Sequence, residues 1–289
     1  MEQFLIIIWM GIMRGMFHML KHSKTCNLKV FVDTKWRVNL PCQDEGSDMV
    51  KFLKTNPQIT HLLLERKYSD SSVLPCVLDM VIEVIMANIP TLTHLNLQKL
   101  NLTTGELSLI AEALKKNSSL LYVNLMSNNI DDKGAAIIAG VLRHNTGIGS
   151  MLLGNNMIRE SGIKAIGESL ESNTNLRSLG LCFNYSGIKG FLQLAKSLYV
   201  NKGLQFLNIR NNAFGMNNYE QILESFRMSP SLKSLSFYCS DFDNKFGPSL
   251  DSNMIYFILL CNQRRGMLGN GRLINDIVVS LFPYLNITR

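Results

Sequence analysis

Several features that would mark an enzyme or a disulfide-stabilised protein are missing from this sequence. Its six cysteines include no Cys-x-x-Cys pair and no metal-ligand spacing, which favours reduced thiols in the cytoplasm. It has neither a G-x-x-x-x-G-K nor a G-x-G-x-x-G loop, and no nucleophile with a recognisable base partner. These absences predict a protein that is not an enzyme and that holds no cofactor and no metal.

Long hydrophobic runs are also missing. The apolar stretch from Phe4 to Met13 covers about ten residues, whereas a helix that crosses a bilayer needs roughly 20. The stretch follows Glu2 rather than a basic segment and has no small-residue cleavage site. We predict no membrane span and assign residues 1–27 to an N-terminal extension, either a loosely attached amphipathic segment or residues ahead of a later start codon. The methionines available for such a start are Met10, Met13, Met16 and Met19.

Acidic residues are fewer than basic ones, 22 against 29, and the formal net charge is +7. This excess favours acidic partners without identifying them. Apolar residues, in contrast, make up 46% of the chain, which is enough to bury a continuous core without disulfides. We therefore expect a folded protein rather than a disordered chain.

An apolar pattern recurs along the chain in the form apolar-x-x-apolar-x-apolar. Its seven copies begin at Ile59, Leu92, Leu120, Ile148, Leu176, Leu204 and Leu232, and the last five steps are each 28 residues long. A fixed period indicates one structural unit that is stacked repeatedly, and this motif is the strand signature of a leucine-rich repeat. The first step is longer, at 33 residues, and predicts a surface insertion at about residues 68–75.

A second periodicity lies between the strand motifs. Apolar residues there follow the i, i+3, i+4, i+7 spacing of a helix with one buried face. One copy is Leu107, Ile110, Ala111 and Leu114. Thr103 and Glu106 have the spacing of a capping box at the start of that helix. The predicted N-caps of the next two helices are Asp131 or Asp132, and Ser161.

Asparagine recurs at two positions of the unit. At position 9, after the strand, its amide can supply both a donor and an acceptor to buried backbone groups in a turn. This set is Asn128, Asn156, Asn184 and Asn212. A second set, three residues before each strand, suits the helix exit and consists of Asn56, Asn117, Asn145, Asn173 and Asn201. We interpret the recurrence as structural.

The 28-residue unit, written L-x-x-L-x-L-x-x-N, resembles the ribonuclease-inhibitor class of leucine-rich repeats over residues 59–242. Its compact, Asn-rich and Cys-poor form is also similar to leucine-rich-repeat effectors of intracellular bacteria such as Legionella. The first resemblance implies an α/β solenoid, a horseshoe with a concave parallel sheet and outer helices. The second implies a cytoplasmic protein, located in the host cytosol if it is a secreted effector.

The predicted organisation follows from the limits of the repeats. Residues 28–58 form an N-terminal cap, a β-hairpin over residues 28–40 followed by the first helix, because the open end of the stack must be covered. Seven repeats occupy residues 59–242. Residues 243–289 form a helical C-terminal cap, with helices expected at residues 251–263 and 273–285.

Residues between the buried positions of each strand should point to the concave face, because successive side chains alternate between the two faces of a sheet. Aromatic and arginine side chains on such a face are typical anchors of a protein interface. The predicted partner-binding residues are His61, Glu65, Arg66, His94, Asn96, Lys99, Tyr122, Asn124, Met126, Arg177, Phe183, Phe206, Asn208, Arg210, Lys233 and Tyr238. The alternative interpretation is a solvated face with scattered apolar groups.

Charge and residue type narrow the predicted partner. The face has five basic residues against one acidic residue, so we expect another protein with an acidic surface. The basic residues are spread singly, which disfavours nucleic acid as a partner. His61 and His94, expected on neighbouring strands near Glu65, do not complete a zinc set, and we interpret them as surface histidines.

The resemblance to ribonuclease inhibitor implies a more specific function, in which the concave face covers the active site of a partner enzyme. The bound partner would then be the catalytic domain of that enzyme. The alternative is an adaptor that recruits a bound protein to other machinery through its C-terminal helices. Residues 272–285 resemble the first helix of an F-box in ubiquitin-ligase subunits but lack its leading Leu-Pro. A sensor domain of an immune receptor is a third reading, without the nucleotide-binding segment of such receptors.

Overall fold

The computed structural model describes residues 4–9, 26–32, 45–66, 75–213, 219–236 and 256–257. All strands of this described part belong to one sheet and follow one another in chain order. Strands β1 to β9 are parallel to their neighbours, and β10 is antiparallel to β9. The strands are β1 (Phe4–Trp9), β2 (Cys26–Val32), β3 (Ile59–Arg66), β4 (His94–Asn96), β5 (Tyr122–Asn124), β6 (Ser150–Leu152), β7 (Ser178–Gly180), β8 (Phe206–Asn208), β9 (Ser234–Ser236) and β10 (Tyr256–Phe257).

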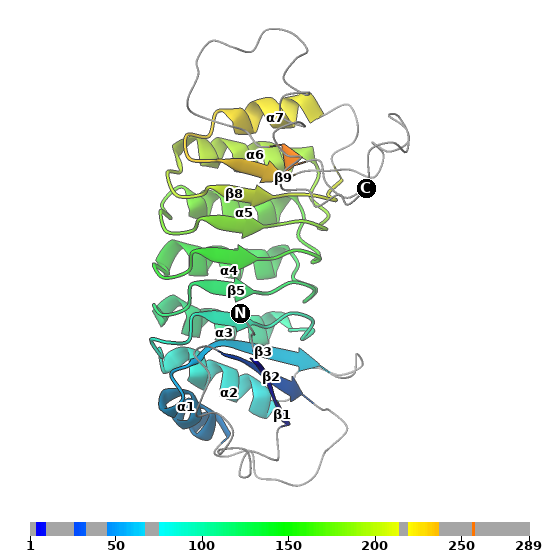
Figure 1. Cartoon of the computed structure of the whole chain (residues 1–289). Helices are drawn as coiled ribbons and strands as arrows, with labels where there is room; N and C mark the ends of the chain where they lie inside the picture. The colour runs from blue at the N-terminus through cyan, green and yellow to red at the C-terminus, as the bar shows by residue number, and fades with distance from the viewer. Residues whose placement is uncertain are drawn as a thin grey trace, which may run out of the picture.

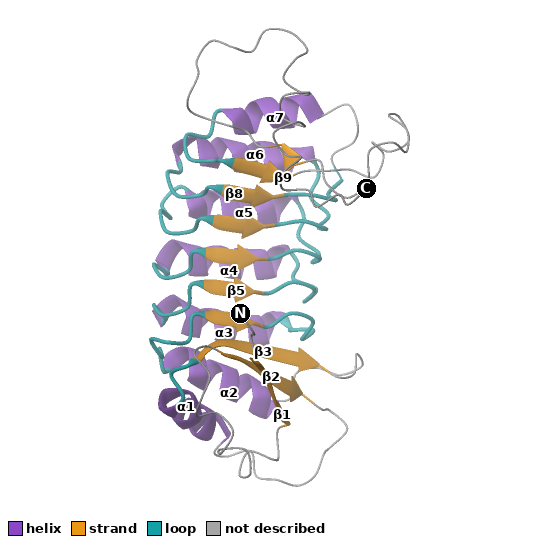
Figure 2. Ribbon diagram, viewed as in Figure 1, coloured by secondary structure: helices purple, strands orange, loops and turns teal. Residues whose placement is uncertain are grey.

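From β2 to β9 the helices alternate with the strands, and they cover one side of the sheet. They are α1 (Glu45–Thr55), α2 (Pro75–Met86), α3 (Thr104–Lys116), α4 (Asp132–His144), α5 (Glu160–Leu170), α6 (Ile188–Val200) and α7 (Tyr219–Arg227). The repeats stack in chain order from α1 to α7 (Figure 1), with the strands in one layer and the helices in the layer behind it (Figure 2). The chain therefore folds as an α/β leucine-rich-repeat solenoid, as the 28-residue period predicts.

The core lies between the sheet and the helices. Of the twenty-one apolar motif positions, twenty are buried, and the last, Phe237, lies outside the described residues. The predicted helical stripe is confirmed in α3, where Leu107, Ile110, Ala111 and Leu114 are all buried. One contiguous hydrophobic cluster runs from Met49 in α1 to Leu235 in β9. Each Å² of apolar surface buried along this stack contributes about 25 cal/mol to its stability.

The position-9 asparagines form a buried ladder that joins successive repeats. Nδ2 of Asn156 donates to the carbonyl of Leu153 in its own repeat at 2.9 Å and to that of Leu125 in the preceding repeat at 3.1 Å. Oδ1 of Asn156 accepts from the backbone N–H groups of Asn128 and Ile130 at 2.9 and 3.0 Å. The amide thus satisfies buried donors and acceptors on both sides, which confirms its structural role.

The second asparagine set also links repeats. Asn145 caps the C-terminus of α4, and its Nδ2 donates to the carbonyls of Leu114 and Asn117 in the repeat before, at 2.6 and 2.7 Å. Its Oδ1 accepts from the N–H of Ile148 at the start of the next strand motif, at 2.7 Å. Equivalent bonds to the preceding helix are made by Asn117, Asn173 and Asn201. The helix C-caps Asn117, Asn145 and Asn201 have extended φ and ψ values, so their role is side-chain bonding rather than a left-handed turn.

Two of the three predicted helix N-caps are confirmed, and the third is wrong. Thr103 and Glu106 form a capping box, and the Asp131 side chain accepts from the N–H of Gly134. The N-cap of α5 is Arg159 instead of Ser161. Asp132 from the preceding repeat caps this helix by accepting from the N–H groups of Arg159 and Gly162, so the cap is supplied across the repeat boundary.

The two ends of the sheet differ from the predicted caps. Strand β2 pairs in parallel with β1 on one edge and β3 on the other, which leaves no edge for the antiparallel partner of the expected hairpin. That partner, residues 36–40, lies outside the described residues. The apolar run expected to be an extension contributes β1, because a strand satisfies its backbone groups by joining a parallel edge. At the other end, Tyr256–Phe257 forms β10 inside a segment expected to be helical, and the rest of residues 243–289 is outside the described part.

Candidate protein-binding face

The strand register aligns the predicted columns of the exposed sheet face. The position-3 residues are paired in one continuous row: His61, His94, Tyr122, Ser150, Ser178, Phe206 and Ser234. The position-5 residues form the neighbouring row, from Leu63 and Asn96 to Ser236. Between these rows the position-4 residues are buried, so the face is built from the residues that the motif leaves outside its core.

Three rings stack at the N-terminal part of this face. The centroids of the His61 and His94 rings are 3.8 Å apart with an interplanar angle of 15°, and Tyr122 follows at 5.3 Å and 28°. Nδ1 of each imidazole lies 2.7 to 2.8 Å from the hydroxyl of the preceding threonine, Thr60 or Thr93. Burial lowers the pKa of both histidines, and the charge of His61 lowers that of His94 further. Both shifts favour the neutral imidazole more than in a free histidine.

The middle of the face has a floor of small residues. A side chain at Gly180 would meet Cδ2 of Leu152 at 2.9 Å, and one at Gly154 would meet Sγ of Cys182 at 2.7 Å and Cε of Met126 at 3.1 Å. Atoms of Leu152, Cys182 and Met126 therefore occupy the space that a side chain at either glycine would need. Burial raises the pKa of the free Cys182 thiol, which disfavours a reactive thiolate there.

Aromatic side chains are exposed at the C-terminal part of the face. Phe206 is 48% exposed and Phe183 is 53% exposed. Phe183 also has a φ of 53°, in the left-handed region that bulky residues rarely adopt. Its backbone N–H donates to the carbonyl of Arg210 at 2.8 Å, so the two loops are joined at this position. Position 8 also has a positive φ in the repeats of Lys99, Ser127, Asn155 and Asn211, so this backbone conformation belongs to the turn of the unit. The exposure of the Phe183 ring is the feature that motivates a role in binding.

Several predicted site residues are engaged inside the protein. Oδ1 atoms of Asn96, Asn124 and Asn208 accept the N–H of the second residue beyond each, and Asn124 is buried. The Arg177 guanidinium donates to the carbonyls of Thr174 and Gly203, at the edge of the sheet. These four residues position the loops, and they leave the aromatic, methionine and remaining basic side chains to form the face.

Three residues that were predicted to bind the partner lie where the structure describes no side chain. Glu65 and Arg66 end β3, where only the backbone is described, and Tyr238 lies outside the described residues. Their roles remain predictions. Among the described side chains at positions 2, 3, 5, 7 and 8, the charged ones are Lys99, Arg177, Arg210 and Lys233, all basic.

Two exposed apolar residues were missed by the column analysis. Met157 is 48% and Tyr185 is 65% exposed, and both occupy position 10, in the loops after β6 and β7. The same position holds Asn101 and Asn129 in two earlier repeats, whose amides bond to each other at 2.6 Å. The sequence signal that could have identified these two residues is the change at position 10 from a polar to a large apolar side chain.

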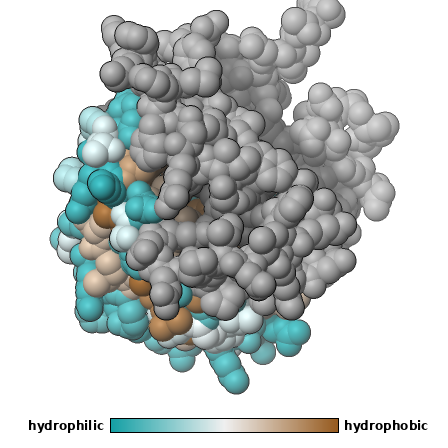
Figure 3. Space-filling model, turned by 90° about the horizontal axis from the view of Figure 1, so that it is seen from below, coloured by the Kyte–Doolittle hydropathy of each residue, from teal (hydrophilic) through white to brown (hydrophobic). Residues whose placement is uncertain are grey.

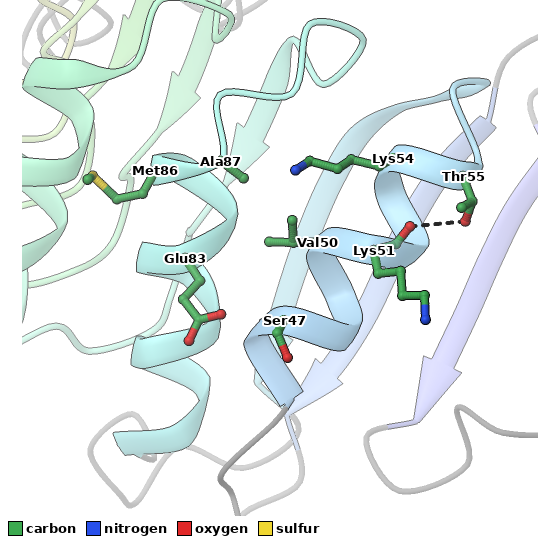
Figure 4. A pocket seen from close by; sticks show the side chains of 8 residues that line it. All are labelled: Ser47, Val50, Lys51, Lys54, Thr55, Glu83, Met86 and Ala87. Carbon is green, nitrogen blue, oxygen red and sulfur yellow. Dashed lines mark hydrogen bonds between the residues drawn. The ribbon is translucent and has the colours of Figure 1, made fainter.

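A separate open pocket lies between α1 and α2, on the helical side of the molecule. Val50 and Lys54 of α1 point toward α2, and the other side of the pocket is lined by Glu83 and Met86 of α2 and by Ala87, which follows it (Figure 4). Seen from this end of the stack, described apolar residues lie in small groups among hydrophilic ones (Figure 3). Mixed polarity and openness are unlike an enclosed small-molecule site, so the sheet face is the better candidate.

Neither metal nor membrane features emerge in the part of the chain that the structure describes. No group of three or more His, Cys, Asp or Glu residues is placed to hold a metal ion among the described residues. No described helix has both the length and the apolar character needed to cross a bilayer.

No protein-family model matches the chain, and neither does any curated protein sequence. Similar solved structures include actin-binding site 2 of leiomodin-1, with 27% identity and a TM-score of 0.47 over 54% of this chain and 91% of that one. The leucine-rich-repeat-containing protein LegL7 from Legionella pneumophila is 20% identical, with a TM-score of 0.48 over 74% of this chain and 65% of that one. The tropomodulin C-terminal domain of Caenorhabditis elegans is 11% identical, with a TM-score of 0.45 over 53% and 92%. The leucine-rich-repeat architecture is established by the chain's own 28-residue period and by its strand register, which agree.

Proposed function

We propose that the protein is a binding module whose exposed sheet face recognises another protein. The observation that supports this most directly is the coincidence, on one face, of exposed aromatic side chains at Phe183 and Phe206 with basic side chains at Lys99 and Lys233. Aromatic and cationic residues are enriched at the energetic centres of protein interfaces. The basic character favours a partner with an acidic surface.

The dimensions of the face suit a protein rather than a small molecule. Six spacings of about 4.8 Å separate β3 from β9, a length of nearly 30 Å. A standard interface of roughly 800 Å² per partner fits on such a surface. The finer role, inhibition of a partner enzyme in the cytoplasm, is a further part of this proposal and rests on the resemblance to ribonuclease inhibitor.

Capture from native lysate followed by quantitative binding tests the proposal. Tyr122→Ala, Phe206→Ala and Arg210→Ala should each weaken binding of the captured protein by about 1 to 3 kcal/mol, mostly through faster dissociation. Leu109→Ala is the matched control, because Leu109 is 53% exposed on the outer helix α3. Equal loss in the control, or no loss in all three face variants, contradicts binding by the sheet face.

Activity of the captured protein tests the finer role. If the partner is an enzyme and inhibition is the function, one equivalent of wild-type protein should suppress its activity, and Phe206→Ala should restore it in step with the loss of affinity. Full activity at saturation favours the adaptor alternative, in which the C-terminal helices contact other machinery.

A further inference from the structure

The junction between repeats 5 and 6, counted from the strand motif at Ile59, differs from the junctions before it. Repeat 5 contains β7 and α6, repeat 6 contains β8 and α7, and the two lie next to each other toward the C-terminal end of the stack (Figure 1). From repeat 2 to repeat 5, asparagine side chains join successive repeats at two places, in the turn after the strand and at the helix exit. Both sets of bonds are incomplete between repeats 5 and 6.

The turn after the strand loses its acceptor bonds at this junction. Oδ1 of Asn156 in repeat 4 accepts from two backbone N–H groups of the preceding repeat, at 2.9 and 3.0 Å. Oδ1 of Asn184 in repeat 5 accepts from the N–H of Ile158 at 3.1 Å. The equivalent atom in repeat 6, Oδ1 of Asn212, is buried without a hydrogen-bond partner in the described structure. Nδ2 of Asn212 still donates to the carbonyl of Leu181 at 3.0 Å, so the bond on the strand side is kept.

The helix exit shows the same loss. Nδ2 of Asn201 in repeat 5 donates to the carbonyls of Leu170 and Asn173 in the repeat before it, at 2.6 and 2.7 Å. The equivalent residue in repeat 6 is Ser229, whose hydroxyl is also buried without a hydrogen-bond partner. Ser231 supplies one substitute, because its hydroxyl donates to the carbonyl of Asn201 at 3.1 Å. The two buried side-chain atoms that lack a partner in the described structure thus belong to one repeat, on either side of α7.

The turn of repeat 5 that Asn212 would join is itself less well stabilised than the turn before it. Ser186 is fully buried at the position where the preceding repeat has the larger, apolar Ile158. The N-cap of α6 is Gly187, and no side-chain hydrogen bond caps this helix among the described residues. Lost apolar contact and a missing cap both lower the free energy needed to open the turn.

The sheet, in contrast, holds repeats 5 and 6 together. Strands β7 and β8 pair without a shift of register, and the N–H of Leu181 donates to the carbonyl of Asn208 at 2.7 Å. The stability of a repeat protein is approximately a sum over repeats and their neighbour interfaces, so one weak interface can open while the others stay closed. The missing bonds lie outside the strands, so an opening here separates the helical layer and leaves the sheet paired.

We propose that this junction is a hinge, at which repeat 6 opens from repeat 5 on the helical side while β7 and β8 stay paired. Phe183 and Phe206, both about half exposed, belong to repeats on opposite sides of the hinge. Separation of the helices behind the sheet tilts these two rings toward each other on the exposed face. The hinge belongs to the free protein and is independent of the proposed binding function.

Amide hydrogen exchange of the full chain, followed by mass spectrometry, tests the hinge. After correction for intrinsic rates, amides in residues 184–190 should exchange about tenfold faster, or more, than those in residues 156–162, the equivalent turn one repeat earlier. The same contrast is expected between α7 and α5. Equal protection of the two turns and of the two helices overturns the inference.

Repair of the junction separates a hinge from fraying at the end of the stack. Ser229→Asn restores the helix-exit amide and should slow exchange in α7 about threefold or more. Ser186→Ile restores the apolar residue of the turn and should slow exchange there by a similar factor. Isoleucine fits because Gly190 occupies the position at which Gly162 makes room for Ile158. Slower exchange in either variant supports the hinge, and unchanged exchange in both overturns it.

The converse substitutions are the matched controls at an intact junction. Asn201→Ser removes the helix-exit bonds between repeats 4 and 5 and should raise exchange in α6 toward the level of α7 in the wild type. Ile158→Ser should do the same for residues 156–162. Circular dichroism of both variants should match that of the wild type. Exchange that stays unchanged in both would show that these groups do not hold a junction closed, which contradicts the inference.

Discussion

Repeats 1 to 3 and repeats 4 to 6 share one backbone scaffold but present different faces. In the first group the rings of His61, His94 and Tyr122 stack on one another, so part of their apolar surface is already covered within the chain. In the second group the small floor leaves Phe206 and Phe183 without such a stack, and both are about half exposed. Residues of the face do not contribute to the repeat core, so they can differ between repeats without changing the scaffold. One part of the face can therefore cover its own rings while a neighbouring part leaves its rings exposed for a partner.

The largest expected effect concerns the core that both groups share. Leu125→Ala in repeat 3 and Leu181→Ala in repeat 5 should each lower the free energy of unfolding by about 2 to 5 kcal/mol, because both side chains are 0% exposed. Chemical denaturation measures this. Changes below about 0.5 kcal/mol in both variants would contradict the shared core.

The asparagine ladder should show an effect of the next size. Asn156→Ala removes bonds to both repeats and should cost about 2 kcal/mol or more, because several buried backbone groups lose their partners. Asn212→Ala should cost less, since Oδ1 of Asn212 is buried without a hydrogen-bond partner in the described structure. The denaturant midpoints of the two variants, compared at equal m-values, measure which substitution lowers stability more. A larger loss of stability in Asn212→Ala would contradict the prediction.

Binding should distinguish the two groups directly. Phe206→Ala should weaken binding of the captured partner by about 1 to 3 kcal/mol. His61→Ala, at the far end of the ring stack, should weaken it by less than about 0.5 kcal/mol. Isothermal titration of both variants measures the difference, and the comparison fails if His61 proves the stronger determinant.

The ring stack should make stability depend on pH in a defined direction. Burial holds the pKa of His61 and His94 below the ordinary value of 6.5, so the unfolded chain takes up protons before the folded one as pH falls. This contribution to stability is fully present above about pH 6.5 and is lost as pH falls toward the lowered pKa values.

Thermal melts between pH 7.5 and pH 5 measure this effect. The melting temperature should fall with pH, and the fall should be smaller in His61→Gln/His94→Gln. An unchanged slope in the double variant would show that the stack does not carry the pH dependence.

The smallest expected effect is that of chelation. EDTA should leave both the melting temperature and the affinity for the captured partner unchanged, because His61 and His94 occupy the stack without a third ligand among the described residues. A loss of affinity restored by zinc, and absent in His61→Ala, would instead establish a metal site.

Most errors of the sequence analysis lie where the repeat stops or where a residue bonds across a repeat boundary. Ser161 was predicted to cap α5, but the carboxylate of Asp132, 27 to 30 positions earlier, occupies that site. Asn124, which was predicted to lie on the binding face, is buried, and its Nδ2 donates to Oε1 of Gln98 in the preceding repeat at 3.4 Å. Its role in binding stays a prediction. A local pattern does not show which of two equivalent side chains reaches the next coil, because that depends on the stacking distance and offset.

The sequence alone determined the repeat, its period, the buried positions and the columns of the face, because one strand motif returns in register and alternate side chains of a strand point to opposite sides. Only the tertiary structure decided that His61, His94 and Tyr122 stack and that Leu152 and Cys182 fill the space beside glycines of neighbouring repeats. Those features depend on contacts between residues about 28 positions apart, whose rotamers are set by the coil stacked against them and not by their own segment.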